Sequence, residues 1–249
     1  EDEFHNSPSQ YGILGVWGHQ MLGGEIPSNF WPLAIKYWVK GQLPDGGWGY
    51  HPPFSSTNNQ DWKQRPLASM TVAGVASMFV CMDAMLQEKY INCKGGDLPA
   101  TIVKGLKWLD KHFAETMVGR GNICHHHYFG YYLYGVERVG RACGYKYFGK
   151  QDWYKLGTLA LLVRQLKDGS WGGFKSVNDI KKAKNPQGNV KETSFSLLFL
   201  ARGRHPVLFN KLNFGGDWNN RPRDIANLTR WMSRNYEQEF NWANINLKV

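Results

Sequence analysis

The sequence lacks both a long apolar run and a recognisable targeting signal. No stretch approaches about 18 consecutive apolar residues, so we expect no transmembrane helix. No basic segment followed by an apolar one indicates a secretory signal peptide. The chain begins with Glu1-Asp2-Glu3 instead of Met, which we interpret as a processed product or a fragment. The missing signal therefore does not decide where the parent protein resides.

Cysteine is scarce as well. The four cysteines are Cys81, Cys93, Cys124 and Cys143, and no two of them form a C-x-x-C pair. A disulfide framework is not expected in a chain of this length, since such frameworks belong to small secreted domains. The spacing of the four cysteines is still compatible with one disulfide bridge.

Acidic residues are outnumbered by basic ones, which gives a formal net charge of +10. A basic chain raises nucleic acid or an anionic surface as a partner. The basic residues are scattered, however, and their densest groups lie in 175–191, 202–204 and 221–223. These groups resemble neither a DNA-recognition helix nor an aromatic platform for stacking bases. We therefore expect a solvated basic surface and no specific nucleic-acid partner.

Aromatic residues, by contrast, are abundant, with 11 Trp, 12 Tyr and 13 Phe. The pattern Gln-x-x-Asp-Gly-x-Trp occurs twice, each time after an apolar helical stretch. Asp-Gly favours a tight turn, Gln can bond backbone groups at the helix end, and Trp can cover the turn. The predicted turn residues are Gln42, Asp45, Gly46 and Trp48 in the first copy and Gln165, Asp168, Gly169 and Trp171 in the second.

Apolar periodicity predicts seven helices before residue 204. Their expected ranges are Ser7–Met21, Phe30–Lys40, Ser69–Leu86, Leu98–Phe113, Tyr128–Cys143, Trp153–Gln165 and Glu192–Ala201. The more buried helices start near Ser7, Ser69, His127 and Thr193, with spacings of 62, 58 and 66 residues. This period of about sixty residues predicts an array of α-hairpins with an inner and an outer layer. In the third hairpin a Gly/His segment replaces the Gln/Trp turn.

The C-terminal part follows a different pattern. Pro206–Phe214 and Asn241–Leu247 alternate like strands, and Arg221–Tyr236 between them is amphipathic. Two strands and a helix make a poor core alone, so we expect the truncated start of an α/β domain. The sequence thus predicts an all-α repeat domain over residues 1–203 and a β-α-β segment over 204–249.

The Gln/Trp turns between inner and outer helices resemble those of the α/α toroid superfamily of squalene cyclases and protein prenyltransferases. Tyr131–Gly140, Pro206–Leu212 and Gly216–Pro222 are similar to a narrower group of large bacterial envelope-associated proteins. In that group a toroid precedes an α/β domain of unknown function. The resemblance implies a bacterial cell-envelope or periplasmic location. A complete toroid has six hairpins and about three and a half are present here, so we expect a partial toroid.

The catalytic motifs of the superfamily are not found in the sequence. No Asp-x-Asp-Asp cyclase motif occurs, and no cofactor is expected. Prenyltransferases bind zinc through Asp, Cys and His at inner-helix starts, and the only comparable cluster is Cys124-His125-His126-His127. Adjacent side chains diverge, so at most two could share an ion, such as Cys124 with His126 or His127. We therefore predict no metal site.

Polar residues near inner-helix starts are the candidate site residues, because these positions face the cavity of a toroid. The candidates are Asn6, Gln10, Ser69, Thr71, His126, His127, Tyr131, Glu192 and Thr193. Helix capping is the alternative explanation for many of them. Glu137 is a further candidate, since it lies beside Arg138 in an apolar helix and a buried carboxylate needs a partner such as Arg141.

These observations favour a non-catalytic binding or scaffold module that holds a protein, a glycan or an apolar molecule. An enzyme acting on terpenoid or prenyl substrates is the first alternative, because aromatic faces stabilise carbocations. A carbohydrate-active lyase or hydrolase is the second. An incomplete toroid leaves helix faces open, so we also expect self-association.

Overall fold

The computed structural model describes residues 5–55, 65–85, 98–118, 128–174 and 176–247. The protein is mainly α-helical, with 57% helix and 9% strand. It divides into two compact units, Glu1–Leu109 and Asp110–Val249, and the division falls within helix α6 (Ala100–Val118). The boundary expected between residues 203 and 204 lies inside the second unit.

The first unit is organised around helix α4 (Ala68–Met85), which packs against α1 (Asn6–Met21) and α2 (Phe30–Gly41). Apolar residues occur on every side of α4, and nearly all of its residues are buried. A helix that is apolar all round is stable only when other elements cover it on several sides, and here they do. It is the centre of the unit's core.

Helix α4 also bears on the expected absence of a transmembrane helix. Over its 18 residues the mean hydropathy is 1.5, so by length and composition it could cross a membrane. It is not an unbroken apolar run, however, because Thr71, Ser77 and Asp83 lie within it. Within the structure 78% of the helix is buried, as the core helix of a folded unit would be. No clear membrane-spanning segment follows from it.

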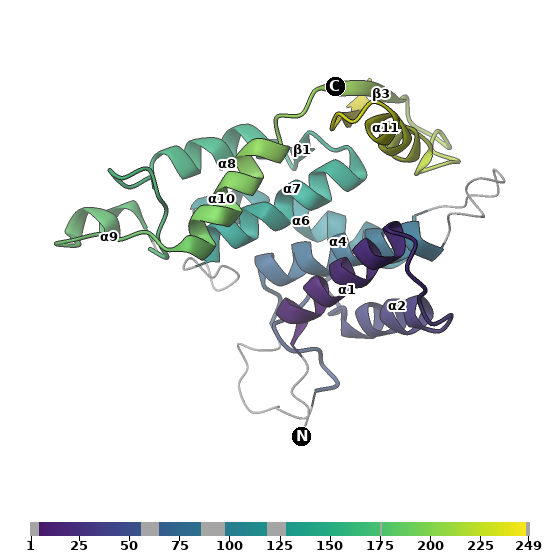
Figure 1. Cartoon of the computed structure of the whole chain (residues 1–249), viewed down its shortest axis with the longest axis horizontal. Helices are drawn as coiled ribbons and strands as arrows, with labels where there is room; N and C mark the ends of the chain where they lie inside the picture. Colours follow the sequence, from purple (N-terminus) through teal and green to yellow (C-terminus); the bar gives the residue numbers. More distant parts are fainter. Residues whose placement is uncertain (1–4, 56–64, 86–97, 119–127, 175, 248–249) are drawn as a thin grey trace. The chain divides into compact units, whose positions relative to one another are not determined.

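In the second unit, α7 (Phe129–Cys143) and α10 (Val190–Arg202) pack against each other (Figure 1). Helix α8 (Trp153–Leu162) completes this layer, and the Tyr154 hydroxyl donates to the Leu200 carbonyl at 2.9 Å. The ring of Phe199 is fully buried beside Gly157, where an added Cβ would lie 2.5 Å from Phe199 Cζ. Glycine is therefore required at this crossing of α8 and α10.

The predicted period is present and is more regular than the sequence indicated. Helices α1, α4, α7 and α10 begin at residues 6, 68, 129 and 190, which are 62, 61 and 61 residues apart. Three small elements were not predicted: the short helix α9 (Val177–Lys182) and the antiparallel pair β1 (Tyr147–Phe148) and β2 (Gln151–Asp152).

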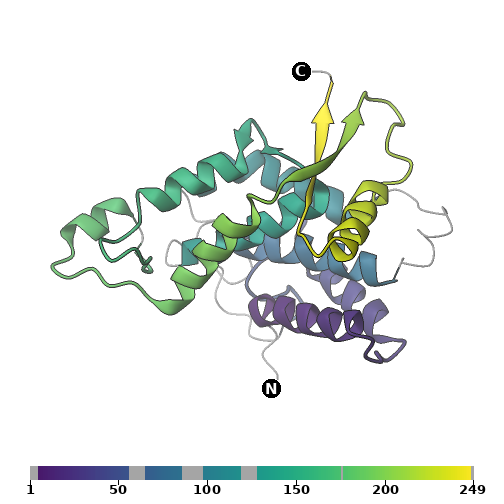
Figure 2. The same ribbon diagram turned by 45° about the horizontal axis from the view of Figure 1, so that its top comes forward.

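The C-terminal residues form a parallel β-α-β unit. Strand β3 (Val207–Asn213) pairs with β4 (Asn241–Asn246) in parallel, and α11 (Asp224–Asn235) connects them (Figure 2). Trp242 of β4 is buried against Gly144, which ends α7 with a φ of +70°. An added Cβ at Gly144 would lie 2.5 Å from the Trp242 ring. This close packing explains why the segment belongs to the second unit.

Candidate functional site

The first Gln/Trp motif is a closed turn held by its own side chains. Gln42 Nε2 donates to the Gly46 carbonyl at 2.9 Å, and Asp45 Oδ1 accepts from the Gly47 N–H at 3.0 Å. Gly46 has a φ of +96°, a conformation that side chains with a Cβ rarely adopt. The turn ends at Trp48, whose ring is completely buried.

The second motif repeats these bonds. Gln165 Nε2 donates to the Gly169 carbonyl at 2.9 Å, and Asp168 Oδ1 accepts from the Ser170 N–H at 3.0 Å. Gly169 has a φ of +84°, and Trp171 is again buried. The shared sequence pattern therefore encodes one local structure, made twice.

Each motif tryptophan joins two helices through its two N–H groups. The indole Nε1 of Trp48 donates to the Trp38 carbonyl, and that of Trp171 donates to the Leu161 carbonyl, both at 2.9 Å. The backbone N–H of each tryptophan donates to a threonine in the first turn of a later helix, α4 or α10. These are Trp48 to Thr71 Oγ1 and Trp171 to Thr193 Oγ1, both at 3.1 Å. Thr71 and Thr193, predicted as cavity residues, thus hold the turns in place.

Asn6 is likewise engaged in structure. It is fully buried, its Nδ2 donates to the Gly49 carbonyl at 2.9 Å, and its Oδ1 accepts from the Tyr37 hydroxyl at 2.9 Å. These bonds fasten the start of α1 to the segment after the first turn. Gln10 and Ser69, the other candidates of this unit, are also buried.

Glu192 lies at the start of α7, although it belongs to α10. Its Oε2 accepts from the Gly130 N–H at 2.8 Å, a place where the helix dipole favours negative charge. Its Oε1 is buried without a hydrogen-bond partner in the described part of the chain. Burial raises the pKa of this carboxyl, which the Gly130 N–H and Lys191 only partly oppose. Nearby, the ring of Tyr131 meets Phe195 edge-on, with centroids 5.5 Å apart.

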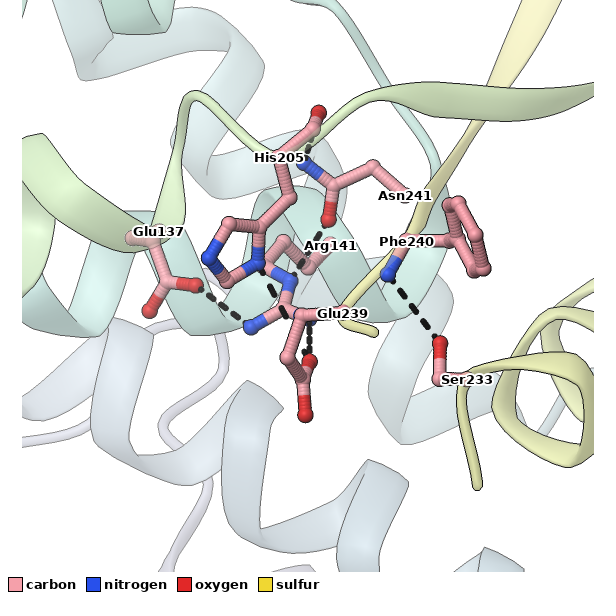
Figure 3. A network of polar contacts seen from close by, with 7 residues as sticks. All are labelled: Glu137, Arg141, His205, Ser233, Glu239, Phe240 and Asn241. Atoms are coloured by element: carbon pink, nitrogen blue, oxygen red, sulfur yellow. Dashed lines mark hydrogen bonds and ion pairs between the residues drawn. The ribbon is translucent and has the colours of Figure 1, made fainter. Parts of the chain in front are cut away.

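Glu137 is completely buried on α7 and is paired with Arg141, as the sequence suggested (Figure 3). Arg141 Nη1 donates to Glu137 Oε1 at 3.2 Å, its Nη2 to Glu239 Oε2 at 2.9 Å, and its Nε to Asn241 Oδ1 at 2.8 Å. Burial raises the pKa of Glu137 in spite of the charges of Arg141, Arg202 and Arg138.

His205 joins this network beyond the end of α10. Its Nδ1 lies 3.9 Å from Glu239 Oε2, and its carbonyl accepts from Asn241 Nδ2 at 3.1 Å. Burial lowers the pKa of His205, and Arg141 acts in the same direction. His205, Glu239 and Asn241 were not predicted, since nothing in the local pattern links them to α7.

Potential metal ligands can be compared only within the described residues. No group of three or more His, Cys, Asp or Glu side chains there could hold an ion. Cys124, His126 and His127 lie outside the described residues. Cys81 and Cys143 are free buried thiols, and burial raises the pKa of each to about 12.

No protein-family model, curated protein or solved structure matches this chain. Any functional conclusion therefore depends on the geometry of the chain itself.

The second unit also exposes apolar side chains that were not singled out from the sequence. Leu159 and Leu162 of α8 and its C-cap residue Val163 are 50%, 57% and 59% exposed. Their spacing of three and four residues places them on one face, which we call the α8 strip. The signal in the sequence was available, because the other face of this helix already holds the buried Trp153 and Leu161.

Proposed function

We propose that this chain is a non-catalytic binding or scaffold module built from helical repeats and a β-α-β segment. In this proposal it belongs to a bacterial envelope assembly and holds a protein partner on the outer surface of its second unit. The partial α/α toroid is the architecture proposed for the repeats, supported by their regular period and by the two matching turns.

The α8 strip carries the proposal. The two motifs lie 123 residues apart, so Leu159 and Val163 correspond to Lys36 and Lys40 of α2. All four side chains are exposed, which makes this an outward face in both units. At these two positions the first unit carries lysine and the second an apolar side chain, whereas Leu162 corresponds to Val39, which is itself 44% exposed. An exposed apolar group where the sister helix carries lysine is more typical of an interaction surface than of a solvated one.

The polar candidates support the same proposal because they already have structural roles. Asn6, Thr71, Thr193 and Glu192 each hold a turn or a helix end by a short hydrogen bond. Much of the aromatic content has a similar structural place, with Trp38, Trp48 and Trp171 buried. These residues support a rigid framework that presents a surface.

The test replaces Leu159 and Val163 of the α8 strip with lysine, the residue that α2 carries at the matching positions. We expect the double variant Leu159→Lys/Val163→Lys to fold with an unchanged melting temperature, because both side chains are exposed. Proteins cross-linked to the wild-type chain in native extracts, through a photoreactive residue at position 162, should be lost from this variant. Lys181→Leu on α9 is the control, since it adds an apolar residue elsewhere on the surface.

Two outcomes would contradict the proposal. One is an unchanged set of cross-linked proteins in the double variant. The other is a measurable turnover of a prenyl, terpenoid or glycan substrate that Glu192→Gln or Tyr131→Phe abolishes in a folded protein, which would favour the enzyme alternatives instead.

A further inference from the structure

The two Gln/Trp turns differ in whether another helix covers them. In the first unit α6 covers the turn: Gln42 Nε2 makes a second hydrogen bond to the Thr101 carbonyl at 2.9 Å. The indole Nε1 of Trp108 donates to Asp45 Oδ2 at 3.0 Å. An added Cβ at Gly46 would lie 2.7 Å from the Lys104 carbonyl oxygen, so the backbone of α6 rests directly on the turn.

The same helix also covers α4. Val75 of α4 is completely buried, and an added Cβ at Gly105 of α6 would lie 2.4 Å from Val75 Cγ2. It would also lie 3.0 Å from the ring of Trp48. Gly105 therefore lets α6 approach closely, and Trp108, three residues later, reaches Asp45.

In the second unit the matching groups are exposed. Gln165 and Asp168 keep the hydrogen bonds within their own turn. Within the described residues, no helix makes the two further bonds that α6 makes to Gln42 and Asp45 in the first unit. The nearest atom to an added Cβ at Gly169 is 4.0 Å away and belongs to Gln165 of the same turn. On α10, Leu197 corresponds to Val75 when Thr193 is matched to Thr71. It is 53% exposed, where Val75 is 0% exposed.

We propose that this face, formed by Gln165, Asp168, Gly169, Leu197 and Leu198, binds an α-helix of a partner protein. The first unit specifies the chemistry of that helix. By analogy with α6, the partner helix offers a backbone carbonyl near its start to Gln165 and places a glycine against Leu197. Three residues after that glycine it carries a tryptophan whose indole N–H donates to Asp168. The inference rests on the proposed binding function, but it uses a different surface from the α8 strip.

Among the helices that the structure describes, none supplies this occupant. Helix α11 carries an exposed tryptophan, Trp231, but Leu228 stands three residues before it, where the close approach requires glycine. Helix α6 has the right pattern, with its own Gly105 and Trp108 already seated on the first turn. A separate polypeptide with the Gly-x-x-Trp pattern on an amphipathic helix is the occupant that fits.

The probe for the test is a synthetic peptide of residues 98–118, which carries the α6 pattern. We expect it to bind the full chain in a fluorescence-anisotropy titration, and Asp168→Asn to weaken binding about tenfold. Asparagine keeps the oxygen that accepts from Ser170 but replaces the outer acceptor with an amide donor. Leu197→Glu and a peptide with Gly105→Leu should weaken binding at least as much.

Matched variants separate the possible results. Asp45→Asn makes the same change in the first turn and should leave peptide affinity unaltered, and Leu159→Lys/Val163→Lys should do so too. No binding, or binding that Asp168→Asn and Leu197→Glu leave unchanged, would overturn the inference while the α8 strip remains testable. A dimer of the free chain that Leu197→Glu dissociates would also overturn it, because the occupant would then be a second copy.

Discussion

Arg141 Nη1 lies 3.2 Å from Oε1 of Glu137, which is one helical turn earlier on α7 and completely buried. The same guanidinium reaches Glu239 and Asn241, which are close to one hundred residues further along the chain. One side chain thus neutralises a buried charge and joins the β-α-β segment to the helices of the second unit (Figure 3).

Loss of this arginine should be costly. We expect Arg141→Ala to lower the free energy of unfolding of the second unit by about 3–5 kcal/mol, because it leaves the Glu137 carboxylate buried without its ion-pair partner. Urea titration followed by circular dichroism measures the change. Adding Glu137→Gln to this variant should restore a substantial part of the loss. If the double variant is no more stable than Arg141→Ala alone, the charge of Glu137 is not the cause.

Stability should also depend on pH through Glu192. Burial raises the pKa of its carboxyl in the folded protein above the ordinary value of 4.5. The folded state therefore holds this proton more tightly than the unfolded state, so the stabilisation is complete below pH 4.5 and is lost as the pH rises through the raised pKa. We expect the wild type to lose stability relative to Glu192→Gln over that interval. The exposed Glu237→Gln provides the control, and a constant difference between wild type and Glu192→Gln would contradict the prediction.

The hydrogen bond from the Trp48 N–H to Thr71 can be tested by an isosteric substitution of the threonine. Thr71→Val removes the oxygen that accepts from the Trp48 N–H and leaves that buried donor unsatisfied. We expect a loss of about 1–3 kcal/mol in the free energy of unfolding of the first unit. Thr71→Ser keeps the oxygen and should lose clearly less. Equal losses for the two variants would show that the methyl group, not the hydrogen bond, matters.

The turn glycines offer a direct comparison of the covered and the open turn. Both Gly46 and Gly169 have positive φ, so alanine strains either turn by about 1 kcal/mol. At Gly46 the new Cβ would also lie 2.7 Å from the Lys104 carbonyl oxygen. Gly46→Ala should therefore lower the melting temperature distinctly more than Gly169→Ala. Similar shifts in differential scanning calorimetry would contradict the difference in cover described for the two turns.

Much of the helical framework could be predicted from sequence because its signals are local. The apolar period of Trp153–Gln165 predicted α8, and the Asp-Gly pair within each motif predicted a turn with positive φ. Helix α9 was missed because it is six residues long and polar, and its Ser176 cap resembles any loop serine. Helix α4 was predicted as Ser69–Leu86 and lies at Ala68–Met85, since its apolar character on all sides marks it clearly in the sequence.

The candidate site was harder to predict because it depends on distant contacts. Thr71 and Thr193 were predicted as cavity residues from their places near helix starts, but the tryptophans they bind lie more than twenty residues earlier. Arg141 was found as a partner of Glu137 at one helical turn, whereas Glu239 and His205 reach the network only through the folding of the β-α-β segment. The motif itself does not indicate which of the two turns is covered by another helix.

The exposed side of α10 has a consequence for local motion. In helical repeats each unit gains stability from the neighbours that flank it, and a helix covered on one side only has the fewest such contacts. The amide hydrogens of α10 should therefore exchange with solvent sooner than those of α7, which α8 and α10 both contact. Slower exchange along α10 in the presence of a bound helix would locate the occupied face residue by residue, whatever the identity of the partner.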